Sequence, residues 1–323
     1  YAGLLSGLND PYSTYYTAEQ YKELNTSNEG SYVGIGAVLQ KDDDGGAKVV
    51  QLYEGGPGEQ AGLKTGDVIK AIDGTDVTEK ETSDIASMVR DSEKDSVTLT
   101  IQRENEEKTQ DIKVEIRDVE IKTVSHEMLS GDTGYIRISE FSEVTSDQYK
   151  KAFADLKSQG MKKLVVDLRD NPGGLLNTVC DILRQILPEG LIVYTEDKNG
   201  KREEETCDGK NELDIPLAVL VNGNSASASE IFAGAVKDYG IGTIVGTTTY
   251  GKGVVQTIQP LTDGSAVKIT IAKYFTPKGN DINKKGITPD VEAELSGDIT
   301  DWAELTHEED TQLQTALKEL EQN

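Results

Sequence analysis

Apolar and polar positions alternate through the first third of the chain. Between Ser31 and Asp118 the stretches YVGIGAVLQ, AKVVQLY, DVIKAID, SVTLTIQR and TQDIKVEI have the period of strands, and turns rich in Gly and Asp separate them. One amphipathic helix interrupts them at TSDIASMVR. The pattern predicts a small, mostly β module over residues 31–118.

Strand-like and helical patterns alternate after this module. TGYIRISEF, KLVVDLRD, LAVLVNG and IGTIVGTT predict strands, and TSDQYKKAFADLKSQG, NTVCDILRQIL and SASEIFAGAVKDYG predict helices. Such alternation is typical of an α/β core with a largely parallel sheet, which we expect over residues 119–292. Within it, LIVYTEDKNGKREEET predicts an exposed hairpin around Asn199 and Gly200.

Two shorter segments flank these domains. Residues 1–30 begin with YAGLLSGLNDPYSTYY, which predicts the middle of a helix running into a turn. Because this start has no Met, basic region or cleavage site, we expect a truncated chain whose targeting segment, if there is one, is missing. Residues 293–323 are a C-terminal extension in which TQLQTALKELEQN predicts a short amphipathic helix.

Charge and cysteine content narrow the function classes. The chain of 323 residues has a formal net charge of -25, which repels nucleic-acid phosphates, so we expect no nucleic-acid partner. It has no run of 18 apolar residues that would predict a membrane-spanning helix. Cys180 and Cys207 match no redox or metal-ligand spacing, which favours buried thiols and leaves a disulfide in an oxidising compartment as the alternative.

The histidine content argues against the most familiar kinds of hydrolase site. A Ser-His-Asp site needs a histidine, and the chain has only His126 and His307, each in a polar, acidic context typical of the surface. Two histidines without clustered carboxylates or thiols also argue against catalytic zinc. A serine nucleophile in this chain would therefore need another base.

Lysine can be that base. Lys252 in TTTYGKGVVQ is flanked by two glycines and followed by two valines. It could therefore be drawn inward, where desolvation would lower its pKa. The alternative for this decapeptide alone is an exposed lysine in a turn.

A candidate nucleophile lies in VNGNSASASEIFAG. A buried strand ends at Asn222 and a helix begins near Ser229, which leaves Ser227 in the turn between them. The next amide, that of Ala228, lies in the first turn of the helix, where free N–H groups can stabilise an oxyanion. A second strand-turn-helix passage, VVDLRDNPGGLLNTV, could supply another such amide.

These stretches together resemble one family, the carboxyl-terminal processing or tail-specific proteases. The matching pieces, in family order, are LNDPYSTYYTAEQY, GSYVGIGAVL, AGLKTGDVIKAIDG, VVDLRDNPGGLL, VNGNSASASEIFAGA, GTTTYGKGVVQT and TPKGNDINKKGITPDVE. The resemblance implies an α/β core of the ClpP/crotonase-like type, with a PDZ domain inserted at residues 31–118. AGLKTGDVI alone indicates only the PDZ domain.

The resemblance also implies roles for individual residues. It makes Ser227 the nucleophile, Lys252 the base and Gln256 the residue that orients the lysine, with oxyanion amides from Gly173 and Ala228. Since residues four apart on a strand share a face, we expect the lysine and the glutamine to point into one cleft.

Two other serines compete for the nucleophile position. Ser225 and Ser229 flank Ser227 in S-A-S-A-S, and their alternative role is local capping and turn hydrogen bonding.

In a PDZ domain, a peptide adds to a sheet edge and backbone N–H groups hold its terminal carboxylate. The resemblance implies that VGIGA provides this loop and that the helix at TSDIASMVR forms the wall of the side-chain pocket. The residues concerned are Gly34, Ile35, Gly36, Ile85, Ala86 and Val89. The alternative for VGIGA alone is an ordinary strand with two glycines.

The resemblance therefore implies a serine endopeptidase that acts on protein or peptide substrates with free C-termini, without a metal or an organic cofactor. Relatives are exported, so we expect an extracytoplasmic location, in the periplasm or at the outer face of the cell membrane. The resemblance is also compatible with a membrane anchor in the missing N-terminal segment and with a homodimer. The sequence departs from the family in GGPGEQAG and RDSEKDS, which bears on PDZ gating contacts and not on the catalytic residues.

Two other function classes remain. A catalytically silent PDZ scaffold would keep a peptide site but would not need the serine and lysine pair. An acyl-CoA enzyme of the crotonase type could use strand-turn-helix amides, yet it would have no use for this pair and usually lacks a PDZ module.

Overall fold

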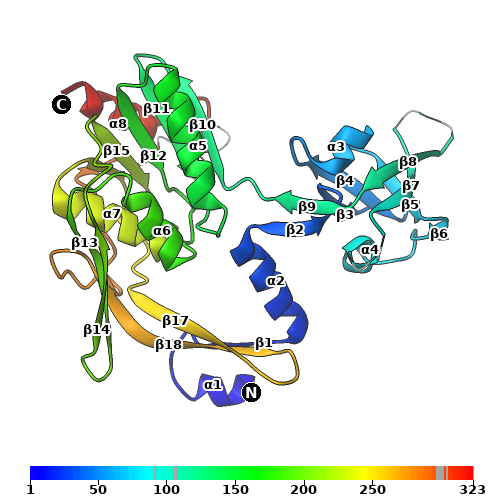
Figure 1. Cartoon of the computed structure of the whole chain (residues 1–323), viewed down its shortest axis with the longest axis horizontal. Helices are drawn as coiled ribbons and strands as arrows, with labels where there is room; N and C mark the ends of the chain where they lie inside the picture. Colours follow the sequence, from blue (N-terminus) through cyan, green and yellow to red (C-terminus); the bar gives the residue numbers. More distant parts are fainter. Residues whose placement is uncertain are drawn as a thin grey trace. The chain divides into compact units, whose positions relative to one another are not determined.

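The computed structural model describes residues 1–90, 92, 94–104, 106, 108–295, 302 and 305–322. The chain divides into two compact units (Figure 1): Gly30–Lys122 forms the smaller one, and Tyr1–Glu29 together with Thr123–Asn323 forms the larger. The boundaries predicted from the sequence for the smaller unit differ from these by a few residues. The prediction also placed the N-terminal segment outside the core, whereas here it belongs to the larger unit.

The smaller unit is mostly β-structure, as predicted. Its main sheet has the order β3-β4-β5-β7-β8, and β2 and β9 form a separate pair. The bounds are β2 (Ser31–Gly34), β3 (Ala37–Lys41), β4 (Ala47–Leu52), β5 (Val68–Ile72), β6 (Thr75–Asp76), which pairs with β5, β7 (Ser96–Gln102), β8 (Gln110–Glu115) and β9 (Arg117–Glu120), with helices α3 (Pro57–Ala61) and α4 (Thr82–Arg90).

The stretch YVGIGAVLQ does not form the single strand that its pattern suggests. Gly36 has a φ of +71°, which turns the backbone between Gly34 and Ala37 and directs the two halves into different sheets. The core of this unit follows the strand period, since Val97, Leu99 and Ile101 on β7 are buried and the residues between them are half-buried.

The larger unit is built on a six-stranded sheet of order β10-β11-β12-β15-β16-β19. Only the β10–β11 pair is antiparallel, which confirms the largely parallel sheet predicted from the alternation. The bounds are β10 (Val124–Leu129), β11 (Thr133–Ile138), β12 (Lys163–Asp167), β15 (Leu217–Val221), β16 (Thr243–Gly246) and β19 (Val291–Glu292).

Helices cover both faces of this sheet. Alternate strand residues, such as Val166 and Val219, pack in one core with α5 (Thr145–Ser158), α6 (Leu176–Leu183) and α7 (Ala228–Tyr239). The residues between them, such as Val165 and Leu220, pack against α8 (Thr311–Gln322), the helix predicted at the C-terminus. Because both faces are covered, the central strands are almost uniformly apolar.

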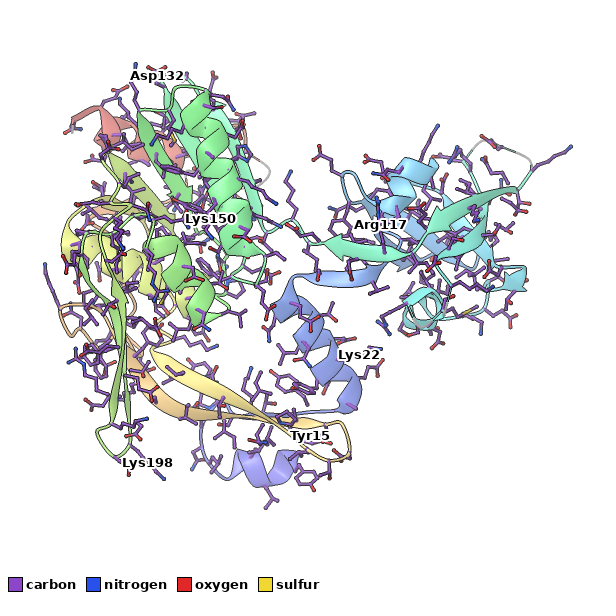
Figure 2. The ribbon with its side chains drawn as sticks, viewed as in Figure 1. Tyr15, Lys22, Arg117, Asp132, Lys150 and Lys198 are labelled. Atoms are coloured by element: carbon purple, nitrogen blue, oxygen red, sulfur yellow. The ribbon has the colours of Figure 1, made fainter. Side chains whose placement is uncertain are left out.

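A second sheet of the larger unit has the order β1-β18-β13-β14, with β17 also paired to β18. The bounds are β13 (Gly190–Asp197), β14 (Arg202–Cys207), β17 (Val254–Pro260) and β18 (Ala266–Phe275). β13 and β14 form the predicted hairpin, with Lys198 near its tip (Figure 2).

The N-terminal segment differs from its prediction as a helical segment. It contains α1 (Ala2–Ser6), α2 (Ala18–Glu29) and, between them, the strand β1 (Thr14–Tyr16), which pairs with β18. A strand of three residues is too short for its period to stand out in the sequence.

Both cysteines are free and buried. Burial raises the pKa of the Cys180 thiol to about 12, so it is an inert apolar group. No helix in the described residues is long and apolar enough to cross a membrane. Within the same residues, no three His, Cys, Asp or Glu side chains lie together in a way that could hold a metal ion.

Candidate active site

Ser227 lies in a sharp turn between β15 and α7. Its backbone has φ 55° and ψ −112°, which is rare for a residue other than glycine. Such strain persists only where surrounding contacts fix the backbone, and it is typical of a nucleophile held between a strand and a helix. The side chain is half-buried and lines a cavity.

The two neighbouring serines have other partners. Ser225 is fully buried, and its hydroxyl donates to the carbonyl oxygen of Leu168 at 2.8 Å. Ser229 is also fully buried, and its hydroxyl donates to the carbonyl oxygen of Asn171 at 3.0 Å. Both hold the turn together, which is the alternative role considered for them.

Lys252 lines the same cavity from the loop before β17. Burial lowers the pKa of its ammonium group, Lys268 lowers it further, and Glu230 acts in the opposite direction. Its Nζ lies 5.5 Å from the ring centroid of Tyr12, and it forms no ion pair with a described carboxylate. The loop lysine is thus half-buried rather than the exposed turn residue that was the alternative.

Glu230 connects the serine turn to the lysine loop. Its buried carboxylate accepts hydrogen bonds through Oε2 from the N–H groups of Ser227 (2.9 Å) and Lys252 (2.8 Å). Its Oε1 accepts from the Gly251 N–H and the Thr249 hydroxyl, both at 2.7 Å. Glu230 was not predicted from the sequence, although Ser227 and Glu230 have the spacing of a capping box.

Tyr274 on β18 makes a second connection between the same two residues. Its hydroxyl contacts the carbonyl oxygens of Ser227 at 3.0 Å and Lys252 at 2.5 Å. Burial raises its pKa well above the ordinary value, and the charge of Glu230 adds to this, so the hydroxyl keeps its proton. The sequence carries no motif that would identify this tyrosine.

Gln256 lies on β17 and also lines the cavity. Its buried Nε2 has no hydrogen-bond partner among the described residues. The expected reason for its position was wrong: Lys252 precedes the strand, and an irregularity between Val255 and Gln256 shifts the register. The two side chains therefore line one cavity without a regular strand period between them.

The cavity has a volume of about 310 Å³. Ser227, Lys252, Gln256 and Tyr274 all line it. Apolar side chains of several elements complete the lining, including Leu24 of α2, Leu176 of α6, Ile231 of α7 and Val254 of β17. A site of this kind offers an extended peptide both apolar contacts and reactive groups. The contribution of α2 was not foreseen from the sequence.

The two backbone amides expected to stabilise an oxyanion differ in their hydrogen bonding. Ala228 begins α7, and its N–H donates to no residue that the structure describes, so it is free for a substrate oxygen. The Gly173 N–H instead donates to Oδ1 of Asn171 at 2.8 Å. Gly173 nevertheless lies against the nucleophile, since a Cβ on it would fall 2.8 Å from the Cβ of Ser227.

The histidines are exposed, as expected. His126 lies 2.9 Å from Asp155, and His307 lies 3.4 Å from Glu127. Neither lines the cavity of Ser227.

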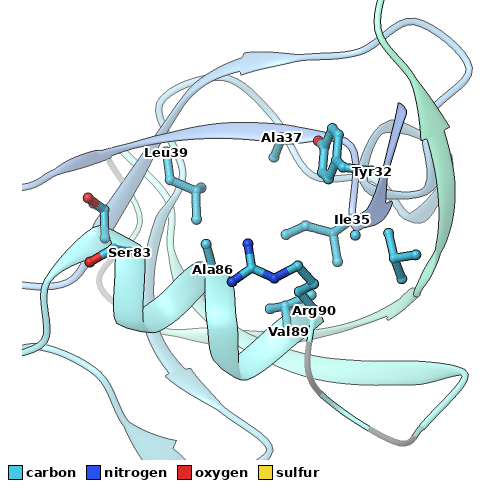
Figure 3. Close-up of a pocket in the computed structure, with 11 residues that line it drawn as sticks. Tyr32, Ile35, Ala37, Leu39, Ser83, Ala86, Val89 and Arg90 are labelled. Carbon is cyan, nitrogen blue, oxygen red and sulfur yellow. The ribbon is translucent and has the colours of Figure 1, made fainter. Parts of the chain in front are cut away.

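The smaller unit has a pocket of its own, of about 320 Å³, between the segment from β2 to β3 and the helix α4 (Figure 3). β3 is an edge strand of its sheet, so a peptide strand can add beside it. The lining includes the expected Gly34, Ile35, Ala86 and Val89. Tyr32 and Arg90 contribute the larger polar side chains.

Two expected residues, Gly36 and Ile85, do not line the pocket. Ile85 is fully buried in the core of the smaller unit. Successive helix residues point about 100° apart, so Ile85 and Ala86 cannot both face the groove. The lining residues Thr82, Ala86 and Val89 have the spacing of one helix face.

Comparison with known proteins identifies the family of the chain and of its smaller unit. Residues 132–293, just over half of the chain, match the model of peptidase family S41. The chain belongs to this family. Residues 48–103 match the model of the PDZ domain, so the smaller unit of this S41 peptidase is its PDZ domain.

Individual relatives extend the match beyond the two family models. The probable CtpA-like serine protease of Staphylococcus aureus (strain N315) is 40% identical over 293 residues, which cover 90% of this chain and 58% of that protein. The corresponding protein of Staphylococcus epidermidis is 38% identical over 292 residues, 90% of this chain and 59% of that protein. The chain thus spans less than two thirds of the length of these relatives.

A solved structure gives the same result for the fold. The photosystem II D1 C-terminal processing protease is 33% identical to this chain and has a TM-score of 0.56. The match covers 94% of this chain and 83% of that one. The predicted fold class, an α/β core of the tail-specific protease type with a PDZ domain, is confirmed.

Proposed function

We propose that this S41 peptidase is a serine endopeptidase whose nucleophile is Ser227 and whose general base is Lys252. The supporting observation is that both side chains line one cavity while one carboxylate oxygen, Oε2 of Glu230, binds both backbone N–H groups. The backbones of the proposed nucleophile and base are thereby held at a common point, which supports the action of both side chains in one site.

In the proposed reaction, neutral Lys252 takes the proton of the Ser227 hydroxyl as Oγ attacks the substrate carbonyl carbon. The carbonyl oxygen becomes an oxyanion, to which the free N–H of Ala228 donates. Lys252 then returns the proton to the leaving amine as the C–N bond breaks, which leaves an acyl-enzyme. Water then attacks the ester carbon and gives a proton to Lys252. As the C–Oγ bond breaks, Lys252 passes this proton to Oγ, which restores the Ser227 hydroxyl and the neutral lysine and releases the acid.

Two further residues complete the proposed site. Gln256 would orient the lysine, because its side chain is directed into the same cavity and its Nε2 has no partner in the described chain. Gly173 would be the second oxyanion donor only after its N–H leaves Asn171, so the second donor depends on a local rearrangement.

We propose that the PDZ domain binds the free C-termini of protein or peptide substrates. An apolar side chain would enter between Ile35 and Val89, and the terminal carboxylate would bind the amides of the Gly34–Gly36 turn. The pocket and the adjacent edge strand β3 support this mode.

From the resemblance we further propose an extracytoplasmic location, with an N-terminal anchor outside this sequence, and a homodimer. Fractionation of cells that express the full-length protein tests the location, and light scattering tests the dimer. Recovery in the cytosol or a monomeric mass would contradict the respective proposal.

The catalytic proposal is tested with a fluorophosphonate probe and unfolded casein. We expect Ser227 to be labelled and casein to be cleaved, and Ser227→Ala to abolish both, by about a millionfold in rate, without loss of the fold. Ser225→Ala should leave labelling in place. A PDZ scaffold or a crotonase-type enzyme would show neither labelling nor cleavage in the wild-type protein.

A further inference from the structure

The C-terminal segment contacts the turn that precedes Gly173. This turn follows β12 and contains Arg169 and Asp170. The contacts come from Trp302 and from Asp310, which directly precedes α8. They tie the end of the chain to a turn that lies against the nucleophile.

Arg169 is a buried cation, 1% exposed, with acceptors for its whole guanidinium group. Nε donates to Asp167, Nη1 donates to Oδ1 of Asp310 (3.0 Å) and Oε1 of Gln312 (3.1 Å), and Nη2 bridges Asp167 (2.6 Å) and Asp310 (2.8 Å). The ring of Trp302 covers the group, with its centroid 4.1 Å from Cζ.

The charge of Arg169 depends on these partners. Burial alone would lower the pKa of the guanidinium, but Asp167 and Asp310 raise it above its ordinary value. A buried cation is tolerated only where its partners are complete, so the position of Arg169 is linked to that of Asp310.

Asp170 carries the connection to the serine loop. Its carboxylate accepts from Nε1 of Trp302 and from the side-chain amides of Asn222 (2.9 Å) and Asn224 (2.8 Å). Its own N–H donates to Oδ1 of Asn222 at 3.0 Å. Its φ of 57° is a left-handed conformation that these contacts hold.

The turn and the serine loop also have little space between them. The carbonyl of Asn171 accepts from the N–H of Ala226 and the hydroxyl of Ser229, both at 3.0 Å. With Gly173 packed against Ser227, a shift of the turn displaces the nucleophile or its oxyanion amides.

We propose that Trp302 and Asp310 are positioning residues, which hold the Arg169–Gly173 turn against the Ser227 loop and so make the acylation rate depend on the C-terminal segment. The inference rests on the proposed role of Ser227. It assigns to the C-terminal extension a part in the reaction in addition to its packing on the sheet.

The test compares three variants of the whole chain by their labelling rates with a fluorophosphonate and by their thermal midpoints. Trp302→Phe keeps an aromatic ring at this position, but it makes the ring smaller and removes the N–H that binds Asp170. Asp310→Asn removes the charge that pairs with Arg169. Leu320→Ala is the control. It removes apolar packing of α8 on the sheet and leaves the partners of Arg169 and Asp170 unchanged.

At a temperature well below all midpoints, we expect Trp302→Phe and Asp310→Asn to be labelled at least about tenfold more slowly than wild type, since small displacements of reacting groups have effects of this size. Leu320→Ala should have a lower midpoint but nearly the wild-type labelling rate. Two results would overturn this inference and leave the proposed function intact. One is a wild-type labelling rate in both Trp302→Phe and Asp310→Asn, and the other is a loss of rate in Leu320→Ala as large as theirs. A wild-type protein that is not labelled at Ser227 would contradict the proposed function as well.

Discussion

The N–H groups of Ser227 and Lys252 donate to the same oxygen atom, Oε2 of Glu230. The nucleophile turn and the base loop are 25 positions apart in sequence, yet one buried carboxylate fixes both. Tyr274 contacts the two carbonyl groups from the other side. The peptide units of both proposed catalytic residues are therefore held at the N–H and at the C=O.

Glu230→Gln should lower both activity and stability. All four partners of this carboxylate donate to it, and an amide has only one accepting oxygen, so at least one backbone N–H loses its acceptor. We expect a loss of about 1–3 kcal/mol in the free energy of unfolding and a fall in kcat of tenfold or more. Glu203→Gln on the exposed face of β14 is the control and should change neither.

The same variant makes a prediction for the pH profile. The charge of Glu230 raises the pKa of Lys252, so its removal should lower that pKa further and move the rising limb of kcat/KM to lower pH. A limb that stays in place while kcat falls would mean that Glu230 acts only through geometry.

The activity should rise with pH through the pKa of Lys252, because only the neutral amine accepts a proton. Lys268 lowers this pKa, so Lys268→Met should raise it and move the limb to higher pH. Lys252→Arg should be inactive, since a guanidinium stays protonated. Replacement of both His126 and His307 by Gln is the control, and a changed profile in that protein would point to a histidine base.

Tyr274→Phe tests the second contact. Loss of one buried hydroxyl should cost about 1 kcal/mol of stability, and it should also lower kcat because both Ser227 and Lys252 lose a partner. Tyr239→Phe is matched to it, since that hydroxyl donates to the carbonyl of Leu191 at 2.9 Å, away from the cavity. Equal effects of the two variants on kcat would show that Tyr274 is merely structural.

The sequence predicts the elements better than it predicts the site. Apolar runs of five residues, such as Leu217–Val221, identify the central strands because both faces of the sheet are covered. The spacing of serine, lysine and glutamine identifies candidates only through family resemblance. Glu230 could have been found from its spacing to Ser227, since a capping box brings the two together.

Other features depend on long-range packing and leave no local signal. The irregularity before Gln256 follows from how β17 pairs with β18, and the bond from the Gly173 N–H to Asn171 depends on a side-chain rotamer. The prediction that Ile85 faces the pocket was wrong by one helix position. Ile85 lies in the core, and its neighbour Ala86 lines the pocket.

The PDZ pocket should make degradation depend on the chain end of the substrate. Although the protein is strongly acidic, nearby backbone N–H groups attract a carboxylate, while the diffuse field is screened over about 8 Å at physiological salt. An apolar last residue in the pocket would contribute about 1.5–3 kcal/mol if it is fully buried. Amidation of a model substrate, or a final Asp, should therefore slow its cleavage without moving the cut site.

Ala86 offers a matched pair of variants for this prediction, because its side chain lines the pocket and is exposed. Ala86→Leu should fill the pocket and abolish the preference for a free apolar end, whereas Ala86→Ser keeps the size and should preserve it. Neither should alter the labelling of Ser227, which lies in the other unit. Equal cleavage of free, amidated and acidic ends by the wild-type protein would mean that the pocket does not read C-termini, because all three ends would then enter the active site with the same probability.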